Sequence, residues 1–168
     1  MAGEFSRRTE TLLAQAEAVC ERRGAKLTEL RRHVLGLVLD AASPTGAYDL
    51  LDRLRQSRRG AAPPTVYRAL DFLLEQGLIH RVELLSAFIG CVAGCTTEHG
   101  EGESHTHSAQ FLICRQCGKV AEMRDPDVTS VLARAAKEAG FSISGATIEA
   151  EGLCSTCQSA SARQAKAN

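Results

Sequence analysis

Two Cys-x-x-Cys pairs constrain the fold of this chain more than any other feature of its sequence. The first pair is Cys114 with Cys117, and the second is Cys154 with Cys157. A Cys-x-x-Cys turn lets two sulfurs face one ion, and four thiolates suit one tetrahedral zinc ion. The segment between the pairs, 118–153, is too long for a compact zinc ribbon, so the second pair must return to the first across a folded unit. We therefore predict a structural zinc ion that holds one domain together.

Two other interpretations of these cysteines remain open. The pairs could be unrelated thiols, or each could be a thioredoxin-like redox motif, although neither has the βαβ context that such a motif needs. The chain has seven cysteines and no apolar N-terminal segment typical of export, so we expect a reducing cytoplasm and metal ligation rather than disulfides. No apolar run approaches the roughly 20 residues needed to cross a bilayer, so we expect no membrane partner.

The charges of the chain are unevenly distributed, although its formal net charge is zero. Residues 22–68 contain many more Lys and Arg than Asp and Glu. A basic region of this kind indicates a polyanionic partner, but most charged helix faces are only solvated surface.

The N-terminal half has the pattern of four helices followed by a β-hairpin. Apolar residues recur at helical spacing, and Thr28 can cap the second helix. Strands over 78–83 and about 87–93 would form the hairpin. This order fits a winged helix-turn-helix whose major-groove helix runs from Thr65 to Gln76. An ordinary helical bundle fits the periodicity almost equally well.

The C-terminal half combines short strands with one helix. We expect strands over 110–114, 119–123 and within 145–152, and a helix over 126–139 with its apolar face turned inward. The predicted fold class is therefore α+β.

The predicted organisation has four parts. They are a winged-helix domain over 1–93 with its wing at about 78–93, a hinge or flexible loop over 94–108, an αβ domain with a three-stranded antiparallel sheet over 109–157, and a disordered tail over 158–168.

Several motifs resemble one known family. The run PTVYRAL (residues 64–70) is similar to the recognition-helix signature of the ferric uptake regulator (Fur) superfamily. The longer run PPTVYRALDFLLEQGLIHRVE (63–83) and AYDLLD (47–52) resemble its zinc uptake regulator branch more closely. With both Cys pairs in family order, the resemblance covers roughly residues 10–157.

The resemblance implies a homodimeric transcription factor without enzymatic activity. It implies repression of zinc uptake and homeostasis genes when zinc is bound. The winged-helix domain would bind double-stranded operator DNA, and the αβ domain would dimerise.

The resemblance also implies a regulatory zinc site in each subunit, in addition to the structural one. The residues at the matching places are His80, Cys91, His107 and Glu122. One thiolate, two imidazoles and one carboxylate form a closed four-coordinate set that suits zinc better than iron or manganese. Taken singly, each of these residues could equally be a helix cap, a packed thiol or part of a solvated face.

The histidine of the loop has competitors. The segment that precedes Cys114 also contains His99, His105 and Cys95, and it looks longer than in relatives. We assign the ligand role to His107 because it lies closest to the predicted strand that ends at Cys114, so the sheet fixes its distance from that strand.

The predicted DNA contacts lie on the basic half. Arg68 is the best candidate for a base contact, because an outward Arg on the major-groove helix can bind guanine bidentately. The family implies that Tyr48 contacts a thymine methyl group or a phosphate. We assign Lys26, Arg31, Thr65 and Tyr67 to the DNA backbone.

Three alternatives to a zinc-responsive repressor fit the sequence less well. A sensor of iron or peroxide usually carries a denser histidine run than HSAQ at 107–110. A zinc-buffering or thiol-redox module would leave the basic half unexplained. A zinc deaminase would use His99, Glu101 and the first Cys pair, but Ile113 stands where that signature has Pro, and the second pair would have no role.

Overall fold

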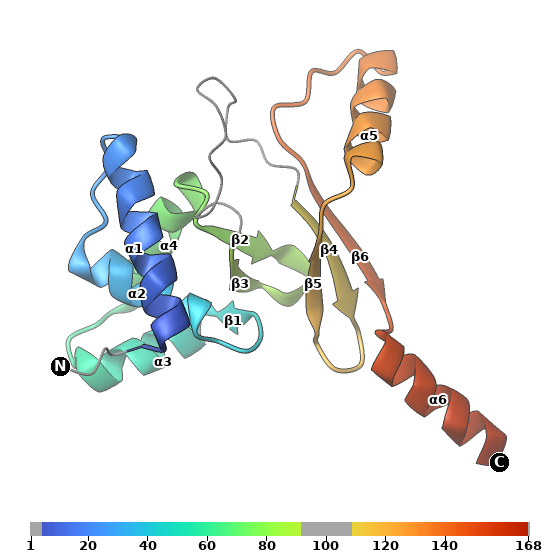
Figure 1. Cartoon of the computed structure of the whole chain (residues 1–168), viewed down its shortest axis with the longest axis horizontal. Coiled ribbons are helices and arrows are strands. Elements are labelled where there is room, and N and C mark those ends of the chain that lie inside the picture. The colour runs from blue at the N-terminus through green and yellow to red at the C-terminus, as the bar shows by residue number, and fades with distance from the viewer. Residues whose placement is uncertain (1–4, 92–108, 168) are drawn as a thin grey trace. The chain divides into compact units, whose positions relative to one another are not determined.

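The computed structural model describes residues 5–91 and 109–167 of the chain (Figure 1). They belong to two compact units, Met1–Glu101 and Gly102–Asn168, and each unit contains its own sheet. The predicted hinge over 94–108 lies outside the described residues, as do Cys95, His99, His105 and His107.

The first unit combines helices with a small sheet. Its elements are α1 (Arg7–Arg22), α2 (Glu29–Leu39), β1 (Thr45–Gly46), α3 (Ala47–Ser57), α4 (Pro63–Glu75), β2 (Ile79–Val82), the 3₁₀ turn η1 (Glu83–Leu85) and β3 (Ala87–Gly90). Four helices followed by an antiparallel hairpin is the order that the sequence predicted.

The core of the first unit is formed by one apolar stripe from each helix. The helical leucines with no more than 1% exposure are Leu13 in α1, Leu35 in α2, Leu50 and Leu54 in α3, and Leu70 and Leu73 in α4. Their spacing places each set on one helix face. Burial of each such side chain contributes about 1.5–3 kcal/mol, so these stripes supply most of the driving force for folding of this unit.

Two arginines hold the last turn of α4. The Arg23 Nη1 atom donates to the backbone oxygen of Gln76 at 2.5 Å. The guanidinium carbon of Arg31 lies 3.6 Å from the centre of the Phe72 ring, and its Nη1 atom donates to the Lys26 oxygen at 2.7 Å. A guanidinium over an aromatic face is attracted by the ring quadrupole. The end of α4 is therefore fixed from both α1 and α2.

The chain passes from α4 into the sheet of the first unit through Gly77. This residue has a φ of 64°, a backbone conformation that glycine adopts with little strain and that is less favourable for residues with a Cβ atom. The strand order is β1-β3-β2, with all pairs antiparallel. The two-residue strand β1 was not predicted, because two residues are too few to show a period.

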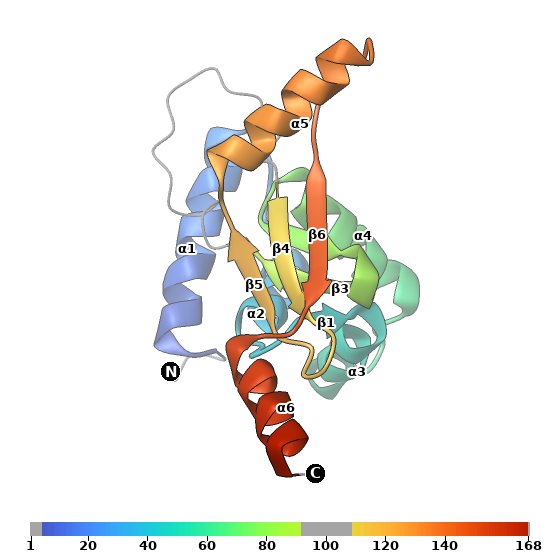
Figure 2. The ribbon, with the colours of Figure 1, turned by 90° about the vertical axis from the view of Figure 1, so that its right-hand side faces the viewer.

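The second unit contains β4 (Ala109–Cys114), β5 (Val120–Met123), α5 (Pro126–Glu138), β6 (Thr147–Gly152) and α6 (Ser155–Ala167). The predicted three-stranded antiparallel sheet is wrong in one respect, because β6 pairs parallel with β4 while β5 pairs antiparallel. Figure 2 shows β4 between β5 and β6, with β4 and β6 pointing the same way. The connection through α5 leaves and re-enters the sheet at the same end, which makes this sheet mixed.

A buried glutamine joins this sheet to α5. Gln110 is 1% exposed; its Oε1 atom accepts from the Asp125 amide at 3.1 Å, and its Nε2 atom donates to the Asp125 oxygen at 2.9 Å. The same Nε2 atom donates to Thr129 Oγ1 at 3.2 Å. Both ends of the amide are thus satisfied, as a buried polar group requires.

Two further expectations for the second unit were wrong. The apolar face of α5 is not fully buried among the described residues: Val128, Leu132 and Ala136 are half-buried, and Val131 is 51% exposed. The predicted disordered tail is instead helical, because α6 extends to Ala167. The run of small and polar residues after Cys157 has good helix formers but little apolar periodicity, so periodicity alone missed it.

The N-terminus of α1 is tied to the end of α2 by a carboxylate. Thr9 is buried, with 2% of its surface exposed. Its hydroxyl donates to Asp40 Oδ1 at 2.8 Å, and the Ser6 amide donates to the same atom at 3.4 Å. These bonds, the one from Thr9 first, lower the pKa of Asp40 below its ordinary value of 3.8.

We expect Asp40→Asn to destabilise the first unit at pH 7 by less than about 1 kcal/mol, because a charged acceptor is lost but solvent screens it. A lowered carboxyl pKa stabilises the fold above the ordinary pKa, and this contribution is lost as the pH falls through the folded value. The difference in urea midpoint between wild type and Asp40→Asn should therefore shrink below pH 4. Glu21→Gln, an exposed change on α1, should leave the midpoint unchanged; a pH-independent difference for Asp40→Asn would contradict the assignment.

Candidate functional site

The parallel pairing of β4 with β6 brings the two Cys-x-x-Cys pairs together. Cys114 ends β4 and is in register with Gly152 at the end of β6, two residues before Cys154. Parallel strands end at the same edge of a sheet, so both pairs lie at that edge. An antiparallel β6 would have placed Cys154 about a strand length away, roughly 20 Å for six residues.

The four sulfurs form one compact cluster. Cys114, Cys117, Cys154 and Cys157 have sulfur atoms that all lie within 4.8 Å of one another. The Cys117 and Cys154 sulfurs are 3.8 Å apart, which is about the edge of a tetrahedron with Zn–S bonds of about 2.3 Å. Gly118, with a φ of 70°, allows the tight turn after Cys117. The geometry therefore fits a four-thiolate zinc site.

Backbone amides make some of these thiols acidic, while burial opposes the ionisation of another. The Cys154 amide donates to Cys114 Sγ at 3.3 Å, and this bond contributes most to lowering the pKa of Cys114 to about 6. The Cys157 amide lowers the pKa of Cys154, whereas burial, followed by the neighbouring sulfurs, raises the pKa of Cys157 to about 12. Four adjacent thiolates repel one another, so full ionisation of the cluster requires a cation among them.

A second pair of metal-type ligands lies at the sheet of the first unit. His80 is on β2 and is in register with Ile89, while Cys91 directly follows β3. A ring nitrogen of His80 and the sulfur of Cys91 lie within 4.8 Å, and Cys91 is 1% exposed. The Cys91 amide donates to the Leu78 oxygen at 3.0 Å, which fixes the thiol beside β2.

The other two predicted ligands are placed differently. Glu122 lies on β5 in the second unit, and its Oε1 atom accepts from Arg124 Nε at 3.2 Å and Nη2 at 3.0 Å. His107 lies outside the described residues. The contact between Arg124 and Glu122 was not predicted from the sequence, because opposite charges two residues apart usually form only weak surface pairs.

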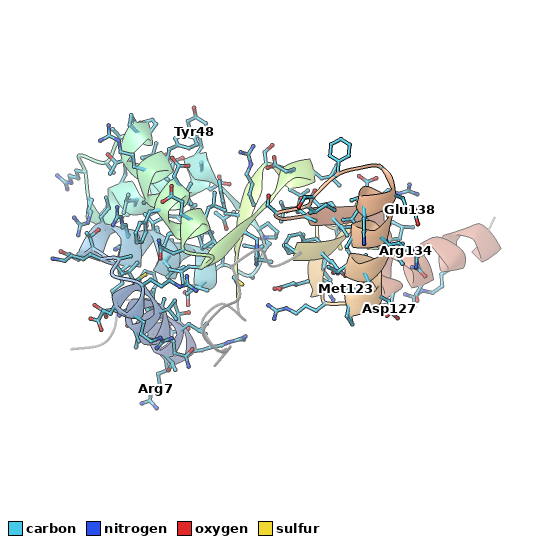
Figure 3. The ribbon with its side chains drawn as sticks, turned by 90° about the horizontal axis from the view of Figure 1, so that it is seen from above. Arg7, Tyr48, Met123, Asp127, Arg134 and Glu138 are labelled. Atoms are coloured by element: carbon cyan, nitrogen blue, oxygen red, sulfur yellow. The ribbon has the colours of Figure 1, made fainter. Side chains whose placement is uncertain are left out.

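The outward face of α4 carries the predicted DNA contacts. Val66, Ala69, Leu70 and Leu73 are buried, whereas Tyr67 and Arg68 are exposed and Thr65 is half-buried. Tyr48, at the start of α3, is 67% exposed and points away from the ribbon (Figure 3). Two aromatic rings and a guanidinium are thus exposed on α3 and α4.

Lys26 and Arg31 lie in the α1–α2 connection and on α2. Lys26 is exposed, and its backbone oxygen accepts the bond from Arg31. The Arg31 guanidinium rests on Phe72, a contact that single-helix periodicity could not show because the two residues come from different helices.

Comparison with known proteins identifies the family. The model of the ferric uptake regulator family matches residues 22–151, and the chain belongs to this family. The zinc uptake regulation protein of Escherichia coli K12 is 42% identical over 149 residues, which cover 89% of this chain and 82% of that protein.

Two solved structures resemble the chain along most of its length. A zinc uptake regulator complexed with zinc and DNA superposes with a TM-score of 0.83 at 40% identity, covering 94% of this chain and 99% of that one. The crystal structure of holo XcZur gives a TM-score of 0.77 at 40% identity, with coverages of 89% and 98%. In the part of the chain that the structure describes, no helix is long and apolar enough to cross a membrane.

We predict that Cys114→Ser removes one metal ion per chain and unfolds the second unit, because three thiolates cannot complete the shell. Structural zinc supplies about 10–16 kcal/mol to the folding of zinc-finger peptides, so little of the unit should survive its loss. Elemental analysis after gel filtration and far-UV circular dichroism measure the two effects. Cys20→Ala is the control, since this buried thiol of α1 lies outside both ligand groups; a Cys114→Ser protein that keeps its full metal content and fold would contradict the prediction.

Proposed function

We propose that this chain is a cytoplasmic, homodimeric repressor that binds operator DNA when zinc is plentiful and controls genes of zinc uptake and homeostasis. The observation that carries the proposal is that two features lie close together in the sequence. The exposed residues of α4 are followed directly by the hairpin that holds the His80–Cys91 pair, with His80 on β2 and Cys91 just after β3. A relative that is 40% identical is a zinc uptake regulator in complex with zinc and DNA.

Two zinc ions per subunit have separate roles in this proposal. The four cysteines of the second unit hold a structural ion, and four sulfur ligands leave no position for water, which argues against hydrolytic chemistry. His80, Cys91, His107 and Glu122 would hold the regulatory ion. The pairing of a buried thiol with an imidazole in the first unit fits a metal of intermediate softness such as zinc.

The regulatory ligands come from both units, and this division suggests how metal could control DNA binding. His80 and Cys91 belong to the unit that carries α4, whereas Glu122 belongs to the second unit. When bound, zinc supplies a divalent charge that all four ligands share. A ligand set shared between the units restricts their relative orientation, and so lowers the ordering cost of placing two α4 helices on one DNA face. By linkage, operator DNA tightens zinc binding by the same factor.

Exposed apolar residues of the second unit support dimerisation. Val131 on α5 is 51% exposed, Phe141 after α5 is 73% exposed, and Leu112 on β4 is 46% exposed. Exposed apolar surface of this extent in a small unit indicates a protein partner, and we assign a second copy of the chain.

The DNA contacts are proposed from the outward residues. Arg68 contacts a base, and Tyr48 contacts a thymine methyl group or a phosphate. Lys26, Arg31, Thr65 and Tyr67 contact the DNA backbone, Arg31 from its position over the Phe72 ring.

We expect Arg68→Ala to weaken operator binding by about 1–3 kcal/mol and to relax the preference at one base pair, because a bidentate contact is lost. Fluorescence anisotropy with the operator and with single-base variants measures both effects at fixed salt. Arg163→Ala removes the same charge from α6 and should cost far less. Equal losses for both variants, with base preference intact, would show that Arg68 contributes only charge.

Cys91→Ser should abolish the zinc response of DNA binding while leaving the structural ion and the dimer in place. Each tenfold change in operator affinity with zinc corresponds to about 1.4 kcal/mol of coupling. A zinc titration followed by operator anisotropy, with gel filtration of the same samples, separates the outcomes. Zinc-independent operator binding by the wild type would sink the proposed function, and a stronger response to Fe²⁺ than to Zn²⁺ would instead favour an iron sensor.

A further inference from the structure

One residue beside the proposed regulatory ligands has no assigned role. Arg124 follows β5 directly, and both its Nε and its Nη2 atoms donate to the same oxygen of Glu122, Oε1, at 3.2 and 3.0 Å. Residues i and i+2 of an extended segment project to the same side, so this contact is built into the local backbone. The other carboxylate oxygen, Oε2, accepts no hydrogen bond from the described residues.

The position of Arg124 is fixed by the buried core of the second unit. The next residue, Asp125, is held by the Gln110 side chain through both its amide and its carbonyl group. Gln110 is 1% exposed, so the backbone at Arg124 cannot shift without breaking buried hydrogen bonds. The backbone that carries Arg124 is therefore fixed, while its side chain is 51% exposed and contacts Glu122 at the surface.

A carboxylate can ligate a metal through one oxygen or through two, and metals differ in which they accept. Zinc in closed protein sites takes four ligands, one from each residue. Manganese and iron(II) favour more oxygen ligands and higher coordination numbers, which a two-oxygen carboxylate helps to supply. Two charge-assisted hydrogen bonds on Oε1 occupy that oxygen, so the carboxylate offers a metal only Oε2.

We propose that Arg124 is a positioning residue that limits Glu122 to one ligand oxygen and thereby favours zinc over divalent metals of higher coordination number. The inference rests on the proposed function, because it requires Glu122 to be a regulatory ligand. Partners that hydrogen-bond to ligating side chains commonly change metal affinity by 10–100-fold, so the effect is measurable.

The guanidinium also weakens the binding of all divalent metals, and the experiment must separate this effect from the preference for zinc. Its positive charge repels every divalent cation, and this repulsion depends on charge rather than on coordination number. The repulsion is equal for Mn²⁺ and Zn²⁺, so it cancels in the ratio of their affinities. That ratio therefore reports only the restriction of Glu122 to one ligand oxygen. Arg124→Lys keeps the charge but loses the two-nitrogen fork, whereas Arg124→Gln loses both.

The test uses the full chain with its four-cysteine site first loaded with one equivalent of zinc. Cobalt(II) is then titrated into the second site, and the Mn²⁺ to Zn²⁺ affinity ratio is measured by competition. We expect both Arg124 variants to bind cobalt with weaker visible absorption, typical of five or six ligands, and to favour Mn²⁺ at least tenfold more than wild type does. Arg134→Gln, an exposed charge removal on α5 (Figure 3), should match wild type.

Two results would overturn the inference, and they are distinguishable. If the variants keep the wild-type cobalt spectrum and affinity ratio, Arg124 does not restrict Glu122, and the proposed function is untouched. If the thiolate-to-cobalt band of the wild type persists in Cys91→Ser, the second site is not the one proposed, and the proposed function fails together with the inference.

Discussion

The pairing direction of one strand determines what the second unit can be. Because β6 runs parallel to β4, both strands end at the same edge, and each delivers one Cys-x-x-Cys pair there. The unit has little core of its own, since α5 buries none of its residues within the described chain. The proposed structural zinc ion on the four cysteines would supply at this edge the cohesion that apolar burial supplies elsewhere, as in other small metal-dependent domains.

The first unit is held together in the opposite way. Its four helices bury leucine stripes around one core, and its polar contacts mainly fix the ends of elements, as Asp40 does for α1 and the two arginines do for α4. Proposed recognition residues therefore stand on a scaffold that does not need metal to fold. The same unit offers His80 and Cys91 as ligands without depending on them for its core.

Local patterns were sufficient for the parts of the structure that are locally determined. Thr28 caps α2 as expected, the leucine periodicity located the four helices, and the cysteine spacing foretold a single cluster. Strand direction was not accessible in this way: Thr147–Gly152 has the same pattern in either direction, and only the path of the α5 connection decides it. The α6 helix was missed because helix propensity without amphipathic periodicity resembles a polar tail.

Interactions between elements were equally hidden from the sequence. The Arg31–Phe72 contact joins different helices. The Arg124–Glu122 contact forms because the extended backbone projects both side chains to the same side. The ligand set itself was proposed from family resemblance, and the described residues place His80 and Cys91 side by side while His107 lies outside them. A set drawn from distant parts of a chain has no local period by which periodicity could detect it.

The contacts of Arg23 and Arg31 with the end of α4 limit which mutant phenotypes can arise at these positions. Arg23 contacts Gln76, which is separated from His80 only by Gly77 and the buried residues Leu78 and Ile79. The end of α4 and β2 therefore form one continuous segment. Substitutions of Arg23 or Arg31 would therefore disturb the proposed DNA-binding surface of α4 and the proposed ligand His80 together. Alleles that separate DNA recognition from metal response should therefore be absent from these positions and arise instead at side chains that leave the segment in place.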